Sequence, residues 1–271
     1  MISYAQNLED VMLARAFAGQ GTGFYIDIGV WHPTIDSVTR HFYDLGWHGV
    51  NVEPLPEQYA LIAAARPRDF NLCAAVCSQR GTVMIHRISG TGLSTLRHDH
   101  AATHEAAGFR PESIEVPTIG LEQLCDEHSA GRTIDFMKID VEGAEAEVIA
   151  SGNWTRFRPR VLVVEATVPN SPVAAYADWE PILLQADYQF VYFDGLNRWY
   201  VRGEDEVQLR PAFHAPPNPF DDYRLAGLAG LADRDDRIAQ LEQRLSSALK
   251  KADRLDRLGA TLLGKLLLRR V

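Results

Sequence analysis

The chain has 271 residues, of which 46% are hydrophobic and 23% charged, enough for one large α/β domain or two small ones. This composition excludes a wholly disordered chain, and no apolar run approaches the ~20 residues that a membrane-spanning helix needs. Three cysteines are too few for a disulfide framework, and the first residues lack the basic flank and apolar core of a signal peptide. These features predict a cytoplasmic protein.

The formal net charge of −9 is unevenly distributed. Residues 233–271 hold ten Lys and Arg against six Asp and Glu, and the other 232 residues hold 17 against 30. A body with so large an acidic excess would repel a phosphate backbone, so the sequence argues against nucleic acid as a partner.

Apolar strands alternate with helical patterns in the first two hundred residues, which is typical of a mostly parallel sheet with crossover helices. Helices are expected at 7–17, 34–45, 54–66, 121–128 and from about 144. Strands are expected at 24–28, 49–53, 70–76, 82–88, 114–119, 134–139, 161–165, 188–193 and 199–202. We expect 70–76 to pair with 82–88 through a turn at 79–81, and the last two strands to form a hairpin around 194–197. The sheet should have six or seven strands, with the nearly continuous apolar run 161–165 at its centre.

Three further segments have distinct compositions. Residues 89–110 are rich in Gly, Thr, Ser and His, which predicts a loop or lid. Four prolines between 211 and 219 indicate an extended linker, and a heptad pattern that begins at Ile238 predicts a short coiled coil with a basic, apolar end. The predicted organisation is therefore a domain at 1–203, a linker at 204–232 and a coiled-coil tail at 233–271.

The first group of candidate functional residues comprises Asp27, Gly29 and Glu53. Gly29 follows one strand, and Glu53 ends the next strand about 24 residues later. In a doubly wound sheet, ligands bind outside the carboxyl ends of the strands, where glycine permits close approach and an acid can bind ribose hydroxyls. This pattern suggests a cofactor that contains a nucleoside, although a simple turn with an incidental acid gives the same pattern. The absence of a three-glycine fingerprint after Gly29 argues against a nicotinamide-dependent dehydrogenase.

The second group is the acidic run Asp140, Glu142 and Glu145, at the end of a buried strand and the start of a helix. Acids in a first helical turn also complement the helix dipole, so a structural role is an alternative. Asp140 lies closest to the strand end, and Glu145 is interpreted as a helix-turn acid.

Four segments in order, 4–10, 24–29, 46–54 and 134–145, together resemble the FkbM family of S-adenosylmethionine-dependent methyltransferases. The resemblance covers about residues 2–203. It implies a Rossmann-like class I methyltransferase sheet, α/β and mostly parallel with an antiparallel last strand. It also implies S-adenosylmethionine as cofactor and O-methylation of sugars or polyketides.

Carried over by motif, the resemblance places Asp27 and Gly29 beside the methionine part of the cofactor and Glu53 on its ribose. The family pattern Gly-Ala-Asn is replaced here by Gly29-Val30-Trp31, which changes the bulk of the cofactor turn.

The resemblance also assigns residues to the rest of the cofactor. Ala75 and Val76, at the end of the third strand, would pass the adenine, and Asp140 would lie beside the sulfonium. Gln6 and Asp10 would close the pocket from the amino-terminal side.

Methyl transfer to a hydroxyl needs in-line positioning, with a base to remove the hydroxyl proton. His32 is the first candidate base, because it follows the cofactor turn and titrates near neutrality; Glu142 and Glu165 are the others. Each could instead be structural. Asp140 with Glu142 could hold Mg²⁺, and the histidines at 98, 100 and 104 have a suggestive spacing, but we predict no metal site.

The leading hypothesis is an O-methyltransferase that acts on a sugar hydroxyl of a bacterial glycan. The alternative is an inactive methyltransferase-like assembly protein, disabled at Val30-Trp31 and working through its coiled coil. In either case the tail predicts a homo-oligomer, and its basic end could contact the inner face of a membrane. Trp199 and Tyr200 are interpreted either as part of the acceptor mouth or as core.

Overall fold

A computed structural model describes residues 1–87, 94–95, 112–228, 238, 241 and 243–246 of the protein. The chain divides into two compact units, one comprising Met1 and Ser3–Tyr223 and the other Ile2 and Arg224–Val271. Within the described part of the chain, no helix is long and apolar enough to cross a membrane.

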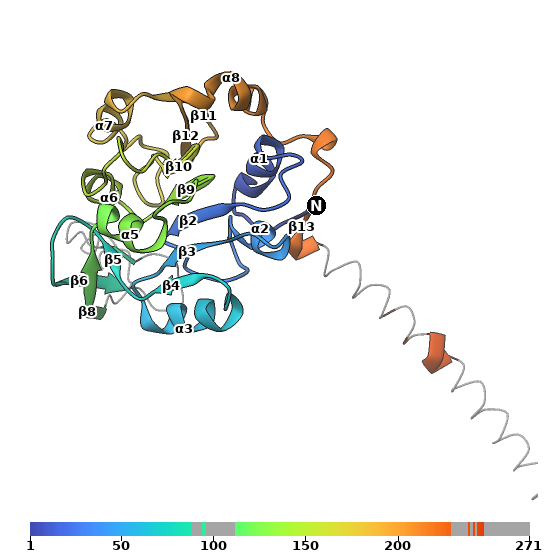
Figure 1. Cartoon of the computed structure of the whole chain (residues 1–271). Coiled ribbons are helices and arrows are strands. Elements are labelled where there is room, and N and C mark those ends of the chain that lie inside the picture. The colour runs from blue at the N-terminus through green and yellow to red at the C-terminus, as the bar shows by residue number, and fades with distance from the viewer. Residues whose placement is uncertain (88–93, 96–111, 229–237, 239–240, 242, 247–271) are drawn as a thin grey trace, which may run out of the picture. The chain divides into compact units, whose positions relative to one another are not determined.

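The first unit is built on a seven-stranded sheet with the order β11-β12-β10-β9-β2-β3-β4 (Figure 1). Its strands are β2 (Phe24–Ile28), β3 (His48–Val52), β4 (Phe70–Leu72), β9 (Phe136–Ile139), β10 (Val161–Glu165), β11 (Tyr188–Phe193) and β12 (Asn197–Arg202). Strands β10, β9, β2, β3 and β4 are parallel, whereas β12 runs antiparallel to both β10 and β11. This is the mostly parallel sheet with an antiparallel last strand that the sequence led us to expect.

A second, four-stranded sheet has the order β5-β8-β6-β7. It contains β5 (Ala75–Val76), β6 (Thr82–Arg87), β7 (Ser94–Thr95) and β8 (Glu112–Ile119). The expected pairing of 70–76 with 82–88 is wrong. The run divides at Cys73-Ala74, so that β4 joins β3 in the large sheet and β5 joins β8, while β6 pairs with β8 and β7.

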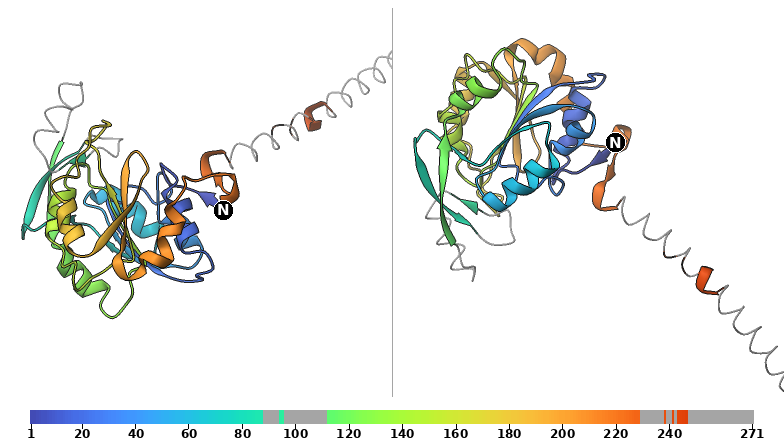
Figure 2. Two further views of the ribbon diagram at one scale, coloured as in Figure 1. Left: turned by 90° about the horizontal axis from the view of Figure 1, so that it is seen from above. Right: turned by 60° about the horizontal axis from the view of Figure 1, so that its bottom comes forward.

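Helices cover both faces of the large sheet (Figures 1 and 2). They are α1 (Glu9–Ala16), α2 (Arg40–Asp44), α3 (Pro56–Ala65), α5 (Leu121–His128), α6 (Glu145–Ala150), α7 (Glu180–Gln185) and α8 (Glu206–Leu209). One core cluster packs α5, α6 and α7 against one face, and the other packs α1, α2 and α8 against the opposite face. Because side chains alternate along each strand, Ile26 belongs to the first cluster and its neighbour Tyr25 to the second.

The helix expected at 34–45 is confined to α2, and the segment before it is irregular. The reason is a fully buried guanidinium, that of Arg66, which donates to the Pro33 carbonyl at 2.8 Å and to the Ser37 hydroxyl at 3.0 Å. The Thr39 hydroxyl in turn donates to Asp27 at 2.8 Å. These tertiary bonds hold the segment against β2 and compete with local helix formation.

Residues 204–221 do not have the extended conformation that the prolines suggested. They form η1 (Gly203–Asp205), α8, η2 (Arg210–Phe213) and η3 (Pro219–Asp221). Leu209 and Phe213 are buried, and Arg15 of α1 binds the carbonyls of Ala212 and Ala215. This segment therefore extends the apolar layer that covers one face of the sheet.

The second unit contributes β13 (Arg224–Leu225), and residues 238, 241 and 243–246 are helical. Most of the predicted coiled coil lies outside the described residues, so its pairing stays a prediction. Ile2 belongs to this unit and lies in β1 (Ile2–Ser3).

Candidate active site

The parallel strands bring four separated residues into one row. The last residue of β2 is paired with the last residues of β3 and β9, and β9 is in register with β10. Gly29, Glu53 and Asp140 each come directly after the last residue of their strand. Glu165 is the last residue of β10 and lies level with Asp140. Because they end neighbouring strands at the same edge of the sheet, they form the rim where ligands bind in folds of this kind.

All four of these residues line one cavity of about 350 Å³. On the β3 side its lining is mainly apolar and comprises Val52, Leu55, Ala74, Ala75, Val76 and Ile85. On the β9 and β10 side and in the amino-terminal segment the lining is mainly polar and comprises Gln6, Asp140, Glu142, Glu165, Thr167, Asn170 and Ser171. The cavity therefore offers an apolar half and a polar half on either side of the β2 and β9 ends.

Gly29 is required by the packing of the chain itself. Its φ is +86°, and a Cβ atom at this position would lie 1.7 Å from the Asp140 carbonyl oxygen. No side chain can occupy that space, so the glycine allows the ends of β2 and β9 to approach each other.

The turn after Gly29 is fixed by Glu53. The Trp31 backbone N–H donates to Glu53 Oε2 at 3.0 Å, and the Leu55 N–H donates to Oε1 at 2.9 Å. Burial raises the pKa of Glu53 to about 7 against the lowering effect of these bonds. Trp31 has a left-handed φ of 53°, which is unusual for an aromatic residue. Val30 and Trp31 line the cavity without filling it.

Lys138 is the functional candidate that sequence reasoning missed. Its Nζ atom donates to the Gly29 carbonyl at 3.1 Å and lies 3.2 Å from Asp140 and 3.8 Å from Asp27. Burial alone would lower the pKa of Lys138, but the carboxylates of Asp140, Asp27 and Glu9 together raise it, so the side chain stays charged. A lysine inside an otherwise apolar strand was the available signal, since buried lysines are almost always paired.

Asp27 lies behind the cavity and is not among the residues that line it. Its Oδ2 atom accepts the Thr39 hydroxyl, and its Oδ1 atom faces Lys138 at 3.8 Å. The structure thus places Asp27 in contact with the residue that holds Asp140 and Gly29, and its predicted contact with a cofactor stays a prediction.

The acidic run after β9 separates into two roles. Glu145 Oε1 accepts the N–H groups of Val141 and Gly143 at 3.0 and 3.1 Å, which stabilises the loop. Glu145 does not line the cavity. This agrees with its interpretation as a helix-turn acid. Glu142 has a left-handed φ of 55° and lines the cavity, and burial together with Asp140 and Glu145 raises its pKa.

Glu165 ends β10 and is 6% exposed. By strand register its side chain lies beside that of Asp140, and its Oε2 atom has no hydrogen-bond partner among the described residues. Burial, with the charges of Asp140, Glu142 and Glu145, raises the pKa of Glu165 far above its ordinary value.

The amino-terminal segment closes the cavity by binding the turn between β11 and β12. The Asn7 side chain donates to the Asp194 carbonyl at 3.3 Å, and Asn197 Nδ2 donates to Glu9 Oε1 at 2.9 Å. As a result Gln6 and Leu196, which are far apart in sequence, line the same cavity.

Asp10 is not on the cavity lining. It accepts bonds from the Ser3 hydroxyl and the Tyr4 N–H, each at 2.7 Å, and so shapes the segment that carries Gln6.

His32 is also absent from the cavity lining. Its Nδ1 atom accepts the backbone N–H groups of Thr34 and Ile35 at 3.1 and 3.0 Å, and burial lowers its pKa. This ring therefore holds a turn, and its role as general base stays a prediction without geometric support. Trp199 and Tyr200 are fully buried, so of the two interpretations, acceptor mouth or core, the structure supports the core.

The described residues contain no group of three or more His, Cys, Asp or Glu side chains that could hold a metal ion. Asp140 and Glu142 both face the cavity as a pair of carboxyls. The histidines at positions 98, 100 and 104 lie outside the described residues.

Comparison with known proteins identifies the class of this domain. A family model described as a methyltransferase FkbM domain matches residues 19–190. The protein therefore carries a methyltransferase domain, and the chain belongs to the FkbM family. The amino-terminal segment with Gln6 precedes the matched region.

Among solved structures, a fibrillarin pre-rRNA processing protein from Methanococcus jannaschii is similar over 73% of this chain and 76% of its own. The two chains are 12% identical, and the TM-score is 0.38. No curated protein matches the chain closely enough to count as a relative.

Proposed function

We propose that the protein is an S-adenosylmethionine-dependent O-methyltransferase that methylates a sugar hydroxyl in bacterial glycan or polysaccharide biosynthesis. One observation carries this proposal. A single cavity at the strand ends gathers Gly29, Glu53 and Asp140, three residues that the family resemblance assigns to the cofactor.

The residues present suit this cofactor in size, shape and charge. A volume of about 350 Å³ is within the range of small-molecule sites. The apolar side that includes Leu55, Ala75 and Val76 suits an adenine ring. Glu53 uses one lone pair of each oxygen for backbone N–H groups, which leaves others for ribose hydroxyls.

Charge also favours a sulfonium over a pyrophosphate. Among the described residues that line the cavity, Lys138 alone is cationic, whereas Asp36, Glu53, Asp140, Glu142 and Glu165 carry carboxyl groups. When bound, the cofactor supplies a methyl group on positively charged sulfur, already activated for transfer. An acidic cavity stabilises that cation and disfavours a dinucleotide.

The polar half of the cavity is suited to an acceptor that is rich in hydroxyl groups. Thr167, Asn170 and Ser171 offer hydroxyl and amide groups, and Glu142 offers carboxyl oxygens. These groups bind and orient a sugar ring by hydrogen bonds, and orientation is the main contribution an enzyme makes when the methyl donor is already reactive.

The second candidate function is an assembly protein that works through its coiled coil. The heptad pattern from Ile238 favours self-association, and the basic end of the tail would suit an anionic membrane surface. The lining of the cavity argues against loss of activity, because Val30 and Trp31 leave it open. We therefore propose an oligomeric enzyme.

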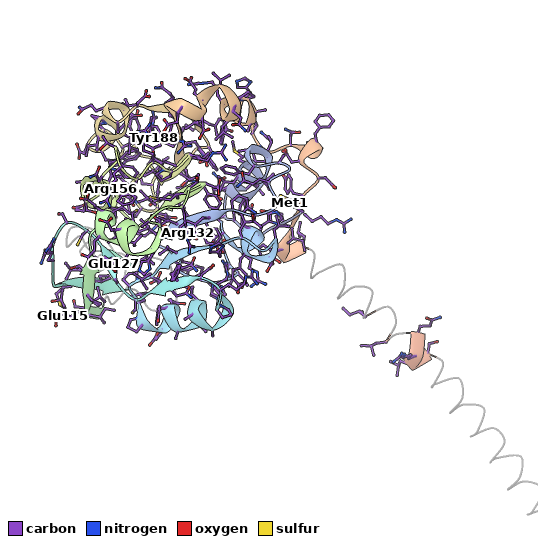
Figure 3. The ribbon with its side chains drawn as sticks, in the orientation of Figure 1. Met1, Glu115, Glu127, Arg132, Arg156 and Tyr188 are labelled. Atoms are coloured by element: carbon purple, nitrogen blue, oxygen red, sulfur yellow. The ribbon has the colours of Figure 1, made fainter. Side chains whose placement is uncertain are left out.

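The reaction is tested by incubating the protein with S-adenosylmethionine that carries a labelled methyl group, together with neutral monosaccharides and bacterial polysaccharides. Glu53→Gln is the site variant, and Glu127→Gln is its matched control. Glu127, labelled in Figure 3, belongs to α5 and is not among the residues that line the cavity. We expect label in a base-stable ether product with wild type and control, and not with Glu53→Gln. Transfer of label to none of the carbohydrates would reject the sugar assignment.

A further inference from the structure

We infer that Asp140 and Glu165 form a hydrogen-bonded pair that holds a single proton on Glu165, and that Asp140 is the carboxylate which takes the proton of the acceptor hydroxyl. This inference rests on the proposed function. It assigns Asp140 a catalytic role and makes Glu165 a positioning residue.

The strand register brings the two carboxyl groups together. Strands β9 and β10 are parallel, with Ile139 opposite Val164, so the next residues, Asp140 and Glu165, lie side by side. Both line the cavity. Two neighbouring carboxyl groups repel each other when both are ionised, so the protonated form of one is favoured, and that group can then donate a hydrogen bond to the other.

The surroundings decide which group carries it. Lys138 Nζ lies 3.2 Å from Asp140 Oδ2, and the Asp140 side chain is 25% exposed, so a negative charge there is both paired and partly solvated. Glu165 is 6% exposed, and its Oε2 atom has no partner among the described residues. A buried, unpaired carboxylate is costly, whereas a neutral acid is not.

The charged groups that face Glu165 favour the same assignment. These are Asp140, which directly follows β9, and Glu142 and Glu145 in the segment beyond it. All three are acidic, and the nearby lysine of β9, Lys138, is already paired with Asp140. Burial and these acids raise the pKa of Glu165, which is consistent with a proton held at neutral pH.

The pair accounts for the proton that methyl transfer releases. The acceptor oxygen forms a bond to the methyl carbon as the carbon–sulfur bond breaks, and the sulfur keeps that electron pair. The hydroxyl proton passes to Asp140, which becomes neutral. The positive charge on sulfur and the negative charge on Asp140 thus disappear together, and Lys138 keeps the Asp27 carboxylate, 3.8 Å away, as its counter-charge.

Calorimetric binding of two probes, S-adenosylmethionine and S-adenosylhomocysteine, tests this charge assignment without an acceptor. The two differ by the methyl group on sulfur and the positive charge that comes with it, so a change in the ratio of their dissociation constants between variants reports the charge nearby. For Asp140→Asn we expect the preference for the sulfonium to fall about fivefold or more, as one lost close charge implies. For Glu165→Gln and Glu165→Met we expect a ratio within about twofold of wild type, because neither changes the charge.

Glu127→Gln is the control for loss of a surface acid and should leave both constants unchanged. Two Glu165 variants are used so that the test still holds if one of them does not fold. A purely structural defect would weaken the binding of both probes equally. A ratio that falls as far in the Glu165 variants as in Asp140→Asn would overturn the inference, because Glu165 would then carry the charge. An unchanged ratio in Asp140→Asn would also overturn it.

The proton-transfer role is tested with an acceptor found in the labelled-methyl experiment. We expect Asp140→Asn to lower kcat about a hundredfold or more and Glu165→Gln, which keeps a hydrogen-bond donor, to stay within about threefold. The reverse order would make Glu165 the base. If wild type binds neither probe, the proposed function itself fails, and this is distinguishable from any result above.

Discussion

At the residue scale, Gly29 shows how one position serves both the fold and the site. A Cβ atom there would lie 1.7 Å from the Asp140 carbonyl oxygen, at a φ of +86°. We expect Gly29→Ala to destabilise the protein by about 2–4 kcal/mol and to lower Tm by about 5–10 °C. Gly21→Ala is the matched control, since a Cβ there meets no atom within 4 Å. Equal melting temperatures for the two variants would contradict this account of Gly29.

The positions in the fold that the sequence predicted best are those of residues whose spacing reflects the sheet, and their roles stay a prediction. Gly29, Glu53 and Asp140 follow strands, and parallel register places them together. His32 also comes shortly after a strand, but its ring accepts two backbone N–H groups and does not line the cavity. The orientation of a side chain after a turn depends on tertiary contacts, so spacing alone could not reveal it.

At the scale of elements, the amino-terminal segment and the β11–β12 turn act as one closure of the cavity. Asn197 is buried and donates to Glu9 and Asp194 at 2.9 and 3.1 Å. Asn197→Ala leaves those acids with fewer donors, which should cost about 1–3 kcal/mol. Because Gln6 and Leu196 depend on this contact, S-adenosylhomocysteine should also bind several-fold more weakly. Thermal melting measures the loss of stability, and calorimetry measures the loss of binding. Unchanged binding would show that this closure does not support the cofactor site.

The sheet strands were largely predictable, whereas the helix expected at 34–45 and two further segments were not. The apolar runs at 24–28, 161–165 and 188–193 coincide with β2, β10 and β11. The error at 70–76 arose because one apolar run serves two sheets, and only the partner strands decide where it divides. The 204–221 segment contains several prolines, which predicted an extended linker. Leu209 and Phe213 are buried, however, and hold the segment in the core. Tyr188, labelled in Figure 3, begins β11 and is likewise fully buried.

At the scale of the whole molecule, buried acids make stability depend on pH. Burial raises the pKa of Glu9, Glu53 and Glu145 to about 7 from 4.5. Between about pH 4.5 and pH 7 the folded state therefore binds more protons than the unfolded state, so the free energy of unfolding falls as pH rises through this interval. Burial lowers the pKa of His32 and His41, which opposes the trend with fewer groups.

We accordingly expect Tm to decrease between pH 5 and pH 8 at constant ionic strength, as measured by differential scanning calorimetry. A Tm that increases over this interval would contradict this account, because the unfolded state would then bind more protons than the folded state.

The carboxy-terminal tail carries a separate prediction about assembly. The heptad pattern from Ile238 predicts dimers or trimers, because two or three helices are needed to bury an apolar seam. Light scattering on the full chain and on a chain that lacks residues 233–271 measures this. We expect the shortened chain to have the mass of a monomer, and an unchanged number of subunits would assign assembly to the rest of the protein.

The central claim is that the cavity at the ends of β2, β3 and β9 binds S-adenosylmethionine. Calorimetric titration with S-adenosylhomocysteine tests it most directly, on wild type, Glu53→Ala and the surface control Glu127→Gln. We predict one site per chain with micromolar affinity, retained in the control and lost in Glu53→Ala while the fold, checked by thermal melting, remains. Absence of binding by wild type, or equal binding by Glu53→Ala, would contradict the claim.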